Sequence, residues 1–248
     1  MGKAVRKHSQ WIIIPAFNEA ATIGAVVDHC RSIGDFVVIV VDDHSRDETR
    51  RQAMAHGACV LSLPIHLGAW GAVQTGLCYA VRHGCELAVT LDGDGQHDPE
   101  DIPRLVQPLM DGSADLVIGS CPERGSRARR LAWSFFRHLT DLPVHDLTSG
   151  FRACNGKTAR LLASRKATLL DYQDIGVLLL VRNAGLRILE VPVAMAPRRH
   201  GISRIFQNWG AVLWYLVYSG CLGISKRPYF VGSPLNPSHV VPAKERIL

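Results

Sequence analysis

The first 120 residues alternate short apolar runs with longer segments of helical periodicity, and this alternation constrains the fold more than any other feature. The apolar runs are bounded by turn residues, which is typical of strands buried on both faces of a sheet. They lie at residues 11–15, 36–41, 59–63, 87–91 and 116–118. Helices are expected between them, at residues 20–33, 47–56, 69–83 and 99–110. The order β-α-β-α-β-α-β-α-β predicts an α/β sheet with short crossovers.

Beyond residue 120 the pattern is looser. Helices are expected at residues 131–139, 160–164 and 176–184, and a further strand at 186–193. With 47% apolar and 20% charged residues, the chain of 248 residues can bury the core of a single domain. Residues 225–248 contain four prolines and are expected to form an extended, flexible tail.

The cysteines and the start of the chain indicate a reducing, cytoplasmic location. The seven cysteines are odd in number and form no C-x-x-C pair, which favours free thiols. The apolar run that ends at Pro15 is shorter than a secretory signal requires. A second apolar stretch, at residues 209–224, is shorter than the ~20 residues that span a bilayer. Its tryptophans and tyrosines favour a helix on the membrane surface or, equally, packing within the domain.

Polar residues follow three of the expected strands at the point where each strand ends. They occupy residues 15–19, 42–45 and 92–97. Because ligands of open α/β sheets bind beyond the carboxyl ends of the strands, these clusters are expected to meet at one edge of the sheet. Asp43 is expected to contact the ligand there, whereas Asp47 is expected to cap the following helix.

The densest cluster is residues 92–97 (DGDGQH), directly after a buried strand. The carboxylates of Asp92 and Asp94, with the carboxamide of Gln96, offer the hard oxygen ligands that Mg²⁺ or Mn²⁺ prefers. Substrate phosphate oxygens would complete the coordination, and the metal would neutralise the charge of a departing diphosphate. A solvated acidic turn is the alternative interpretation of an isolated D-x-D.

Several motifs, in order along the chain, resemble those of family 2 glycosyltransferases. The first three are residues 12–19 (IIIPAFNE), 40–43 (VVDD) and 91–97 (LDGDGQH). The similarity continues through four more motifs, at residues 66–72 (HLGAWGA), 146–152 (DLTSGFR), 190–193 (EVPV) and 198–204 (RRHGISR). Within the family, the chain is most similar to the branch that contains dolichyl-phosphate mannose synthase and bacterial polyprenyl-phosphate sugar transferases.

The resemblance implies a GT-A fold, a Rossmann-like nucleotide-diphospho-sugar transferase fold with a mixed, mostly parallel central sheet flanked by helices. Residues 1–205 would form the catalytic domain, followed by an amphipathic or membrane-surface helix at 206–224. The metal, Mg²⁺ or Mn²⁺, would be bound by Asp92, Asp94 and Gln96. The nucleotide-sugar would contact Asp92 and Asp94 together with Pro15, Phe17, Glu19, Val41, Asp43, Gly93, Arg198 and Arg204, the two arginines gripping the diphosphate.

Three positions depart from the family's usual pattern. Cys121 stands where an arginine usually helps to hold phosphate, so either Arg124 or Arg127 substitutes for it or phosphate affinity is weaker. Phe17 replaces the usual tyrosine, which keeps a ring for stacking but removes a hydroxyl. Arg204 is commonly a lysine in the family, and the exchange keeps the charge while changing the geometry of the contact.

The resemblance further implies an inverting transfer from GDP-mannose or a UDP-hexose to a polyprenyl (dolichyl or undecaprenyl) phosphate. A phosphate acceptor is largely ionised near pH 7, because its second pKa is about 6, and needs no strong base. A hydroxyl acceptor would need one, and Asp174 is the candidate, with a loop carboxylate of no catalytic role as the equal alternative. Such an enzyme would lie in the cytoplasm, peripheral at the cytoplasmic face of the membrane.

Two further functions in the same family stay open. One is a transferase that adds a sugar to a cell-surface glycan intermediate. The other is a non-catalytic nucleotide-sugar-binding homologue, which the cysteine at position 121 suggests.

Phosphatases of the haloacid-dehalogenase type also use D-x-D, but on an early strand and followed by Thr or Val. Here the motif follows the fourth expected strand and precedes Gly95 and Gln96.

Metal binding by histidines and nucleic-acid binding are the remaining alternatives. The histidines have no regular metal-ligand spacing and are interpreted as solvated or packing residues; they include His66, His97, His138, His145 and His200. Residues 111–248 carry 19 Lys and Arg against 9 Asp and Glu. Because no nucleic-acid-binding motif accompanies this positive charge, no nucleic-acid partner is expected.

Overall fold

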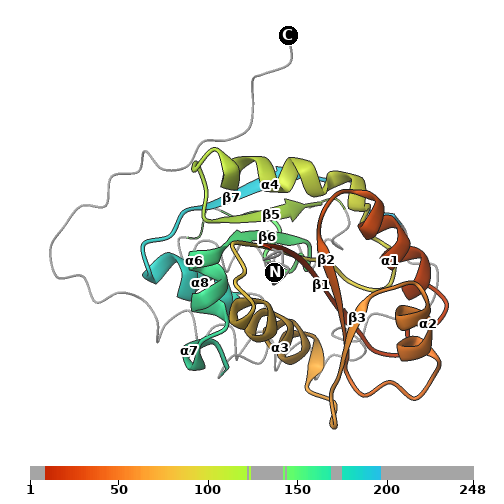
Figure 1. Ribbon diagram of the computed structural model, residues 1–248. Helices are drawn as coiled ribbons and strands as arrows, with labels where there is room; N and C mark the ends of the chain where they lie inside the picture. The colour runs from red at the N-terminus through yellow and green to blue at the C-terminus, as the bar shows by residue number, and fades with distance from the viewer. Residues whose placement is uncertain (1–8, 122, 124–141, 143, 169–174, 197–248) are drawn as a thin grey trace, which may run out of the picture.

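A seven-stranded sheet in the order β3-β2-β1-β4-β6-β5-β7 runs through the computed structural model (Figure 1). The structure describes residues 9–121, 123, 142, 144–168 and 175–196. Strand β6 is antiparallel to both of its neighbours, and every other pairing is parallel. This confirms the mixed, mostly parallel sheet. The strands are β1 (Gln10–Ala16), β2 (Val37–Asp42), β3 (Cys59–Ser62), β4 (Leu87–Thr90), β5 (Leu116–Ser120), β6 (Arg152–Asn155) and β7 (Ile188–Pro192).

Helices connect the strands and cover both faces of the sheet. Those expected in the first 120 residues are all present, with ends within three residues of the prediction, and α8 and β7 confirm the later helix and strand. The helix expected at 131–139 and the segments 206–224 and 225–248 lie outside the described residues. The helices are α1 (Ile23–Ser32), α2 (Thr49–Ala55), α3 (Gly68–Arg82), the 3-10 turn η1 (Pro99–Asp101), α4 (Ile102–Met110), α6 (Gly156–Leu162), α7 (Arg165–Thr168) and α8 (Ile175–Asn183).

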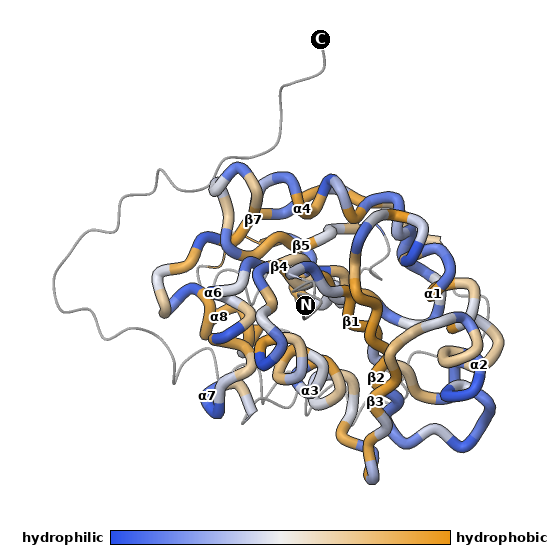
Figure 2. The backbone as a smooth tube through the Cα atoms, in the orientation of Figure 1, coloured by the Kyte–Doolittle hydropathy of each residue, from blue (hydrophilic) through white to orange (hydrophobic). Residues whose placement is uncertain are grey.

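Alternating side chains divide the core into one layer on each face of the sheet. Along β1, Ile12 and Ile14 pack with α1, α2 and α4, whereas Trp11 and Ile13 pack with α3, α6 and α8. All four side chains are buried. Because both faces are covered, the strands are continuously apolar rather than alternating. Accordingly β1, β2 and β3 are orange in Figure 2, while the helices carry blue outward-facing turns.

Strand β6 was not predicted from the sequence. It has four residues and begins with Arg152, which is buried although it is charged. The guanidinium is satisfied locally, because it donates to the carbonyl oxygens of Ser149 (2.8 Å) and Leu147 (3.2 Å). The central residues, Ala153 and Cys154, form an apolar run too short to indicate a strand. By filling the gap between β4 and β5, this strand brings the preceding loop to the carboxyl end of β4.

The thiols of the described residues are free. Burial raises the pKa of Cys30 to about 12 and that of Cys85 to about 11. Thiols with such pKa values stay protonated at neutral pH and are poor nucleophiles. Among the described helices, none combines the length and the apolarity needed to cross a bilayer.

Helix α3 packs closely on β1 because a glycine faces the strand. A Cβ atom added at Gly76 would lie 2.4 Å from Cγ2 of Ile13 and 3.1 Å from Cγ2 of Val41. Both neighbours are β-branched, fully buried and therefore unable to swing aside. The helix keeps a residue of poor helical propensity here because no larger side chain fits.

We therefore expect Gly76→Ala to destabilise the protein. The higher helix propensity of alanine would stabilise the helix by about 1 kcal/mol. Overpacking costs typically 1–3 kcal/mol, and because the added Cβ would lie 2.4 Å from a rigid neighbour, we expect a cost near the upper end of that range. Urea denaturation followed by circular dichroism measures the difference. Gly34→Ala is the control, because its Cβ would make only ordinary contacts at 3.7 Å, and we expect a change within about 0.5 kcal/mol. Equal stability of the two variants would contradict the packing argument.

Candidate functional site

The three polar clusters that follow β1, β2 and β4 lie against one another at the carboxyl edge of the sheet. The backbone N–H of Asp43 donates to the carbonyl of Ala16 at 2.9 Å, which joins the ends of β1 and β2. The hydroxyl of Thr22 donates to the carbonyl of Gly93 at 2.8 Å, which joins the start of α1 to the loop after β4. The expected meeting of the three clusters is therefore observed.

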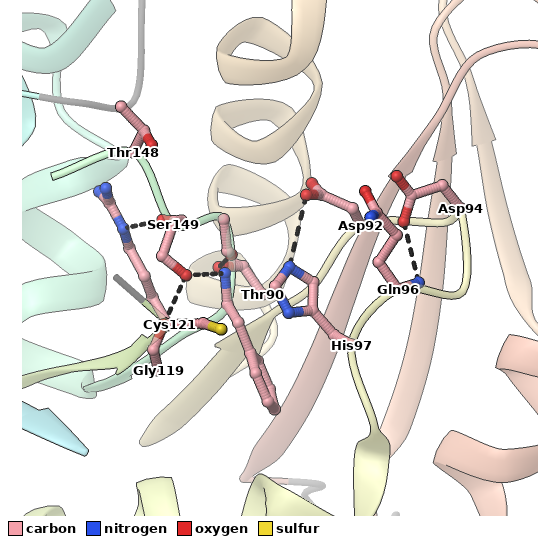
Figure 3. Close-up of polar contacts among 12 residues, drawn as sticks. Thr90, Asp92, Asp94, Gln96, His97, Gly119, Cys121, Thr148 and Ser149 are labelled. Carbon is pink, nitrogen blue, oxygen red and sulfur yellow. Dashed lines mark hydrogen bonds and ion pairs between the residues drawn. The ribbon is translucent and has the colours of Figure 1, made fainter. Parts of the chain in front are cut away.

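The loop after β4 presents two carboxylates that differ in burial. Asp94 is buried, and its Oδ1 accepts the N–H of Gln96 at 3.1 Å, whereas Asp92 is partly exposed. Between them lies Gly93, where a Cβ atom would meet the carbonyl oxygen of Pro15 at 3.4 Å. The turn is thus packed against the end of β1, with both acids at the sheet edge (Figure 3).

Gln96 ties this loop to the segment that follows β7. The side-chain amide of Gln96 donates to the backbone carbonyl of Ala196 at 3.1 Å, and the backbone carbonyl of Gln96 accepts the N–H of Ala196 at 2.9 Å. This side-chain contact is made through Nε2. Any bond from Gln96 to a metal would be made through Oε1, because hard cations take the carbonyl oxygen of a carboxamide. His97 extends the same connection through a backbone bridge to Met195.

The carboxylate of Asp92 is bounded on one side by Gly150, which lies in the motif at residues 146–152 but was given no role from the sequence. A Cβ atom at Gly150 would lie 2.8 and 2.9 Å from the two carboxylate oxygens of Asp92. The carbonyl of Gly150 accepts the hydroxyl of Thr90 at 2.8 Å, which holds the glycine over the end of β4. Any larger residue at position 150 would displace the acid.

The loop that carries Gly150 is anchored to β5 and β7 by two carboxylates, of which Asp146 is buried and Glu190 is partly buried. Oε1 of Glu190 accepts the backbone N–H groups of His145 and Asp146, both at 2.8 Å. Asp146 is fully buried and accepts the N–H groups of Thr148 (3.2 Å) and Cys121 (3.3 Å). Cys121 thus occupies the end of β5 beside this loop (Figure 3). The backbone N–H of Cys121 thus helps to hold the loop through Asp146, independently of the thiol side chain.

On the β2 side, Asp43 holds the segment that precedes α3. Its carboxylate is 2% exposed; Oδ1 accepts the N–H of Leu67 at 2.7 Å and Oδ2 lies 2.8 Å from Nδ1 of His66. The ring of His66 in turn lies on that of Phe17, with centroids 4.3 Å apart. Two partly exposed aromatic rings therefore stand beside the polar clusters, positioned by a buried acid whose two oxygens already have partners.

Asp47 links the start of α2 to the loop after β1. It lies one residue before the N-cap position, which is Glu48, so the expected cap is displaced by one residue. Oδ1 still accepts the N–H of Thr49 at 3.0 Å, and Oδ2 accepts the N–H of Ala20 at 3.1 Å. Burial acts to raise the pKa of Asp47, but the hydrogen bonds from Thr49 and Ala20 outweigh it and lower the pKa.

The structure brings together most of the site residues expected from the sequence. Val41 differs from the others, because its side chain is fully buried in the core beneath α3. The residues gathered at the sheet edge are Pro15, Phe17, Glu19, Asp43, Asp92, Gly93, Asp94 and Gln96. The expected positions that lie outside the described residues are Arg124, Arg127, Asp174, Arg198 and Arg204.

Comparison with known proteins finds similarity over the strands that build this site. The family model described as Glycosyl transferase family 2 matches residues 11–161. Undecaprenyl-phosphate mannosyltransferase of Micrococcus luteus is 29% identical, over 78% of this chain and 86% of its own length. UDP-N-acetylglucosamine–dolichyl-phosphate N-acetylglucosaminyltransferase of Methanococcus voltae is 28% identical, over 78% of this chain and 88% of its own.

A solved structure shares the fold. Glucosyl-3-phosphoglycerate synthase of Mycobacterium tuberculosis, crystallised with Mn²⁺, UDP-glucose and glycerol 3-phosphate, superposes with a TM-score of 0.65 at 26% identity. The match covers 88% of this chain and 78% of that one. The similarity therefore extends beyond the motifs to the arrangement of the sheet and its helices.

The double role of Asp43 yields a stability prediction. Asp43→Ala leaves the N–H of Leu67 and the ring of His66 without their acceptor, and we expect a loss of about 1–3 kcal/mol in the free energy of unfolding. Asp43→Asn is the matched control, because its side-chain oxygen can still accept the N–H of Leu67 and the loss should be smaller. Urea denaturation measures both values. An alanine variant as stable as the wild type would show that the two contacts contribute nothing to the free energy of unfolding.

Proposed function

This chain belongs to glycosyl transferase family 2, and on this basis we propose that it transfers a sugar from a nucleotide-sugar to a polyprenyl phosphate, using a divalent metal ion held by Asp92 and Asp94. The GT-A fold is shared with the mycobacterial synthase. One observation carries the proposal: the two acids lie at the same sheet edge as the Phe17–His66 ring pair and Asp43. An acidic, oxygen-rich site beside aromatic rings suits a metal-bound diphosphate joined to a nucleoside.

The two carboxylates fit Mg²⁺ or Mn²⁺ in a particular way. Within the described ranges, no group of three His, Cys, Asp or Glu side chains could hold a metal unaided. Mg²⁺ is commonly bound by one or two carboxylates and completes its shell with waters and substrate phosphates. We infer that Asp92 and Asp94, with Gln96 through its Oε1, hold the metal weakly until the donor diphosphate arrives. When bound, the metal would neutralise charge on the departing nucleoside diphosphate.

The chemistry that we propose is a single inverting displacement. An oxygen of the acceptor phosphate attacks the anomeric carbon of the sugar while the bond to the β-phosphate oxygen breaks, and the nucleoside diphosphate leaves. Because a phosphate monoester is largely ionised at neutral pH, with a second pKa of about 6, the acceptor needs no strong base. In this scheme Asp174 acts as a base only with a hydroxyl acceptor.

The relatives guide the choice of donor and acceptor. One is named for a mannosyl transfer to undecaprenyl phosphate, the other for a transfer from UDP-N-acetylglucosamine to dolichyl phosphate. We infer GDP-mannose or a UDP-hexose as the donor, with the Phe17–His66 rings beside the base and Asp43 supporting them from below. Arg198 and Arg204 would contact the diphosphate. A lipid-linked acceptor would place the enzyme at the cytoplasmic face of the membrane, where residues 206–224 are the candidate contact.

Metal and nucleotide should therefore stabilise the protein together and not separately. We expect Mn²⁺ with UDP or GDP to raise the Tm by about 5–10 °C at saturation, because binding at 100 times the Kd contributes about 2.7 kcal/mol. Asp92→Asn and Asp94→Asn should abolish the part of the shift that depends on metal. Asp35→Asn, an exposed acid in the connection between α1 and β2, is the control and should leave it unchanged. A shift that survives both asparagine variants would place the metal elsewhere.

The acceptor is tested by a radiolabelled transfer assay with purified protein, Mn²⁺, a labelled nucleotide-sugar and undecaprenyl phosphate in detergent. We expect the label to enter the organic phase as an acid-labile sugar phospholipid. In a parallel assay that contains glycan acceptors as well, labelled oligosaccharide in place of labelled lipid would favour a glycan acceptor. Absence of turnover with GDP-mannose, UDP-glucose and UDP-N-acetylglucosamine, despite metal-dependent binding, would favour a non-catalytic binding protein.

A further inference from the structure

His97 is buried without any hydrogen-bond partner among the described residues. Its side chain is 1% exposed, and neither Nδ1 nor Nε2 has a partner. Buried polar side chains are almost always hydrogen-bonded, so each exception needs an explanation. The other buried side-chain polar atom without a partner, within the same part of the chain, is the single hydroxyl of Thr158 in α6. An imidazole with both nitrogens unpaired is the more costly exception.

The surroundings of His97 hold its ring in one place. One side of the ring packs against Phe151, with centroids 5.1 Å apart, and the backbone pairs with Met195. On the other side, Nε2 lies 3.6 Å from Oδ2 of Asp92 (Figure 3). That distance is beyond a normal N–H···O hydrogen bond, so a shift of a few tenths of an ångström in the carboxylate would close the contact.

The carboxylate of Asp92 has two close neighbours, Gly150 and His97. Gly150 allows this close approach, since a Cβ atom there would lie within 3 Å of both carboxylate oxygens. A movement of the carboxylate toward the ring of His97 would shorten the 3.6 Å separation between Oδ2 and Nε2. Carboxylates that bind metals are generally oriented by such hydrogen-bond donors in the surrounding shell.

We propose that His97 is a positioning residue that donates a hydrogen bond from Nε2 to Oδ2 of Asp92 in the metal-bound enzyme and so orients this acid for the metal. The inference rests on the proposed function, because it assigns a task to His97 only if Asp92 binds a metal. In the metal-free protein the unpaired imidazole is a cost to stability. In the metal-bound protein the same imidazole has its partner.

Packing against Phe151 is the competing explanation, and it makes opposite predictions. A packing role is served at least as well by phenylalanine, which fills similar space and has no polar atoms to desolvate. A positioning role depends on a donor at the place of Nε2. The amide nitrogen of glutamine reaches that place, whereas that of asparagine reaches the place of Nδ1.

The test measures Mn²⁺ binding in the presence of saturating UDP or GDP, by the electron paramagnetic resonance of free Mn²⁺, for full-length wild type and variants. We expect His97→Phe to raise the Kd for Mn²⁺ by about 10–100-fold, in the range found for partners of metal ligands. The Tm of the metal-free His97→Phe protein should be equal to that of the wild type or higher by about 2–4 °C, as relief of a buried unpaired group implies. His97→Gln should restore most of the affinity, and His97→Asn should not.

The control is His83→Phe, which changes a histidine at the end of α3 that stacks on Tyr79, and it should leave the Kd for Mn²⁺ unchanged. If the wild type itself binds no Mn²⁺ with either nucleotide, both the proposed function and this inference are wrong. If the wild type binds and His97→Phe binds equally well, the function stands and the positioning role is excluded. If the His97→Phe protein does not fold, equal Mn²⁺ affinities of the His97→Gln and His97→Asn variants would exclude the positioning role instead.

Discussion

The contact between Gly150 and the carboxylate of Asp92 is the constraint on which the geometry of the site depends. It exists because β6 runs antiparallel between β4 and β5, with Thr90 opposite Arg152, so that the residues before β6 lie over the end of β4. If β6 were parallel to β4, its amino end and the residues before it would lie at the opposite edge of the sheet, away from the end of β4. The mixed sheet therefore shapes the candidate site, and the carboxylates of Asp146, which is buried, and Glu190, which is partly buried, hold the loop before β6 in place.

The buried polar groups around the site show how the fold distributes its electrostatic costs. Asp43 accepts from two partners, and Arg152 donates to two carbonyl oxygens. Each of these buried charged groups therefore has hydrogen-bond partners that offset the cost of removing it from water. His97 is different, because its two nitrogens are buried without partners. Natural proteins break a local rule of this kind mainly at functional sites. The mismatch lies beside Asp92, where a bound metal would change the position of the neighbouring acid.

The first 120 residues were predictable from local patterns, whereas the second half was only partly so. Strands such as β1 carry continuous apolar runs, and helices such as α3 carry a clear period, so both kinds of element and their order followed from sequence. Strand β6 did not, because its polar ends leave an apolar run of two residues. In the site, the acids of the D-x-D turn were identified in advance. Thr90 was not, and Gly150 was included only as part of the motif at residues 146–152 with no role assigned, since neither residue type signals a ligand.

Local sequence was sufficient to establish the α/β alternation, the family resemblance and the pair of acids after β4, because each depends on residues close together in the chain. It could not establish that Asp43 already has partners for both oxygens, that His97 is buried without one, or that Gly150 bounds Asp92. These facts depend on contacts such as that between Thr90 and Gly150, 60 residues apart. Such contacts are set by strand register and packing, which no local propensity encodes.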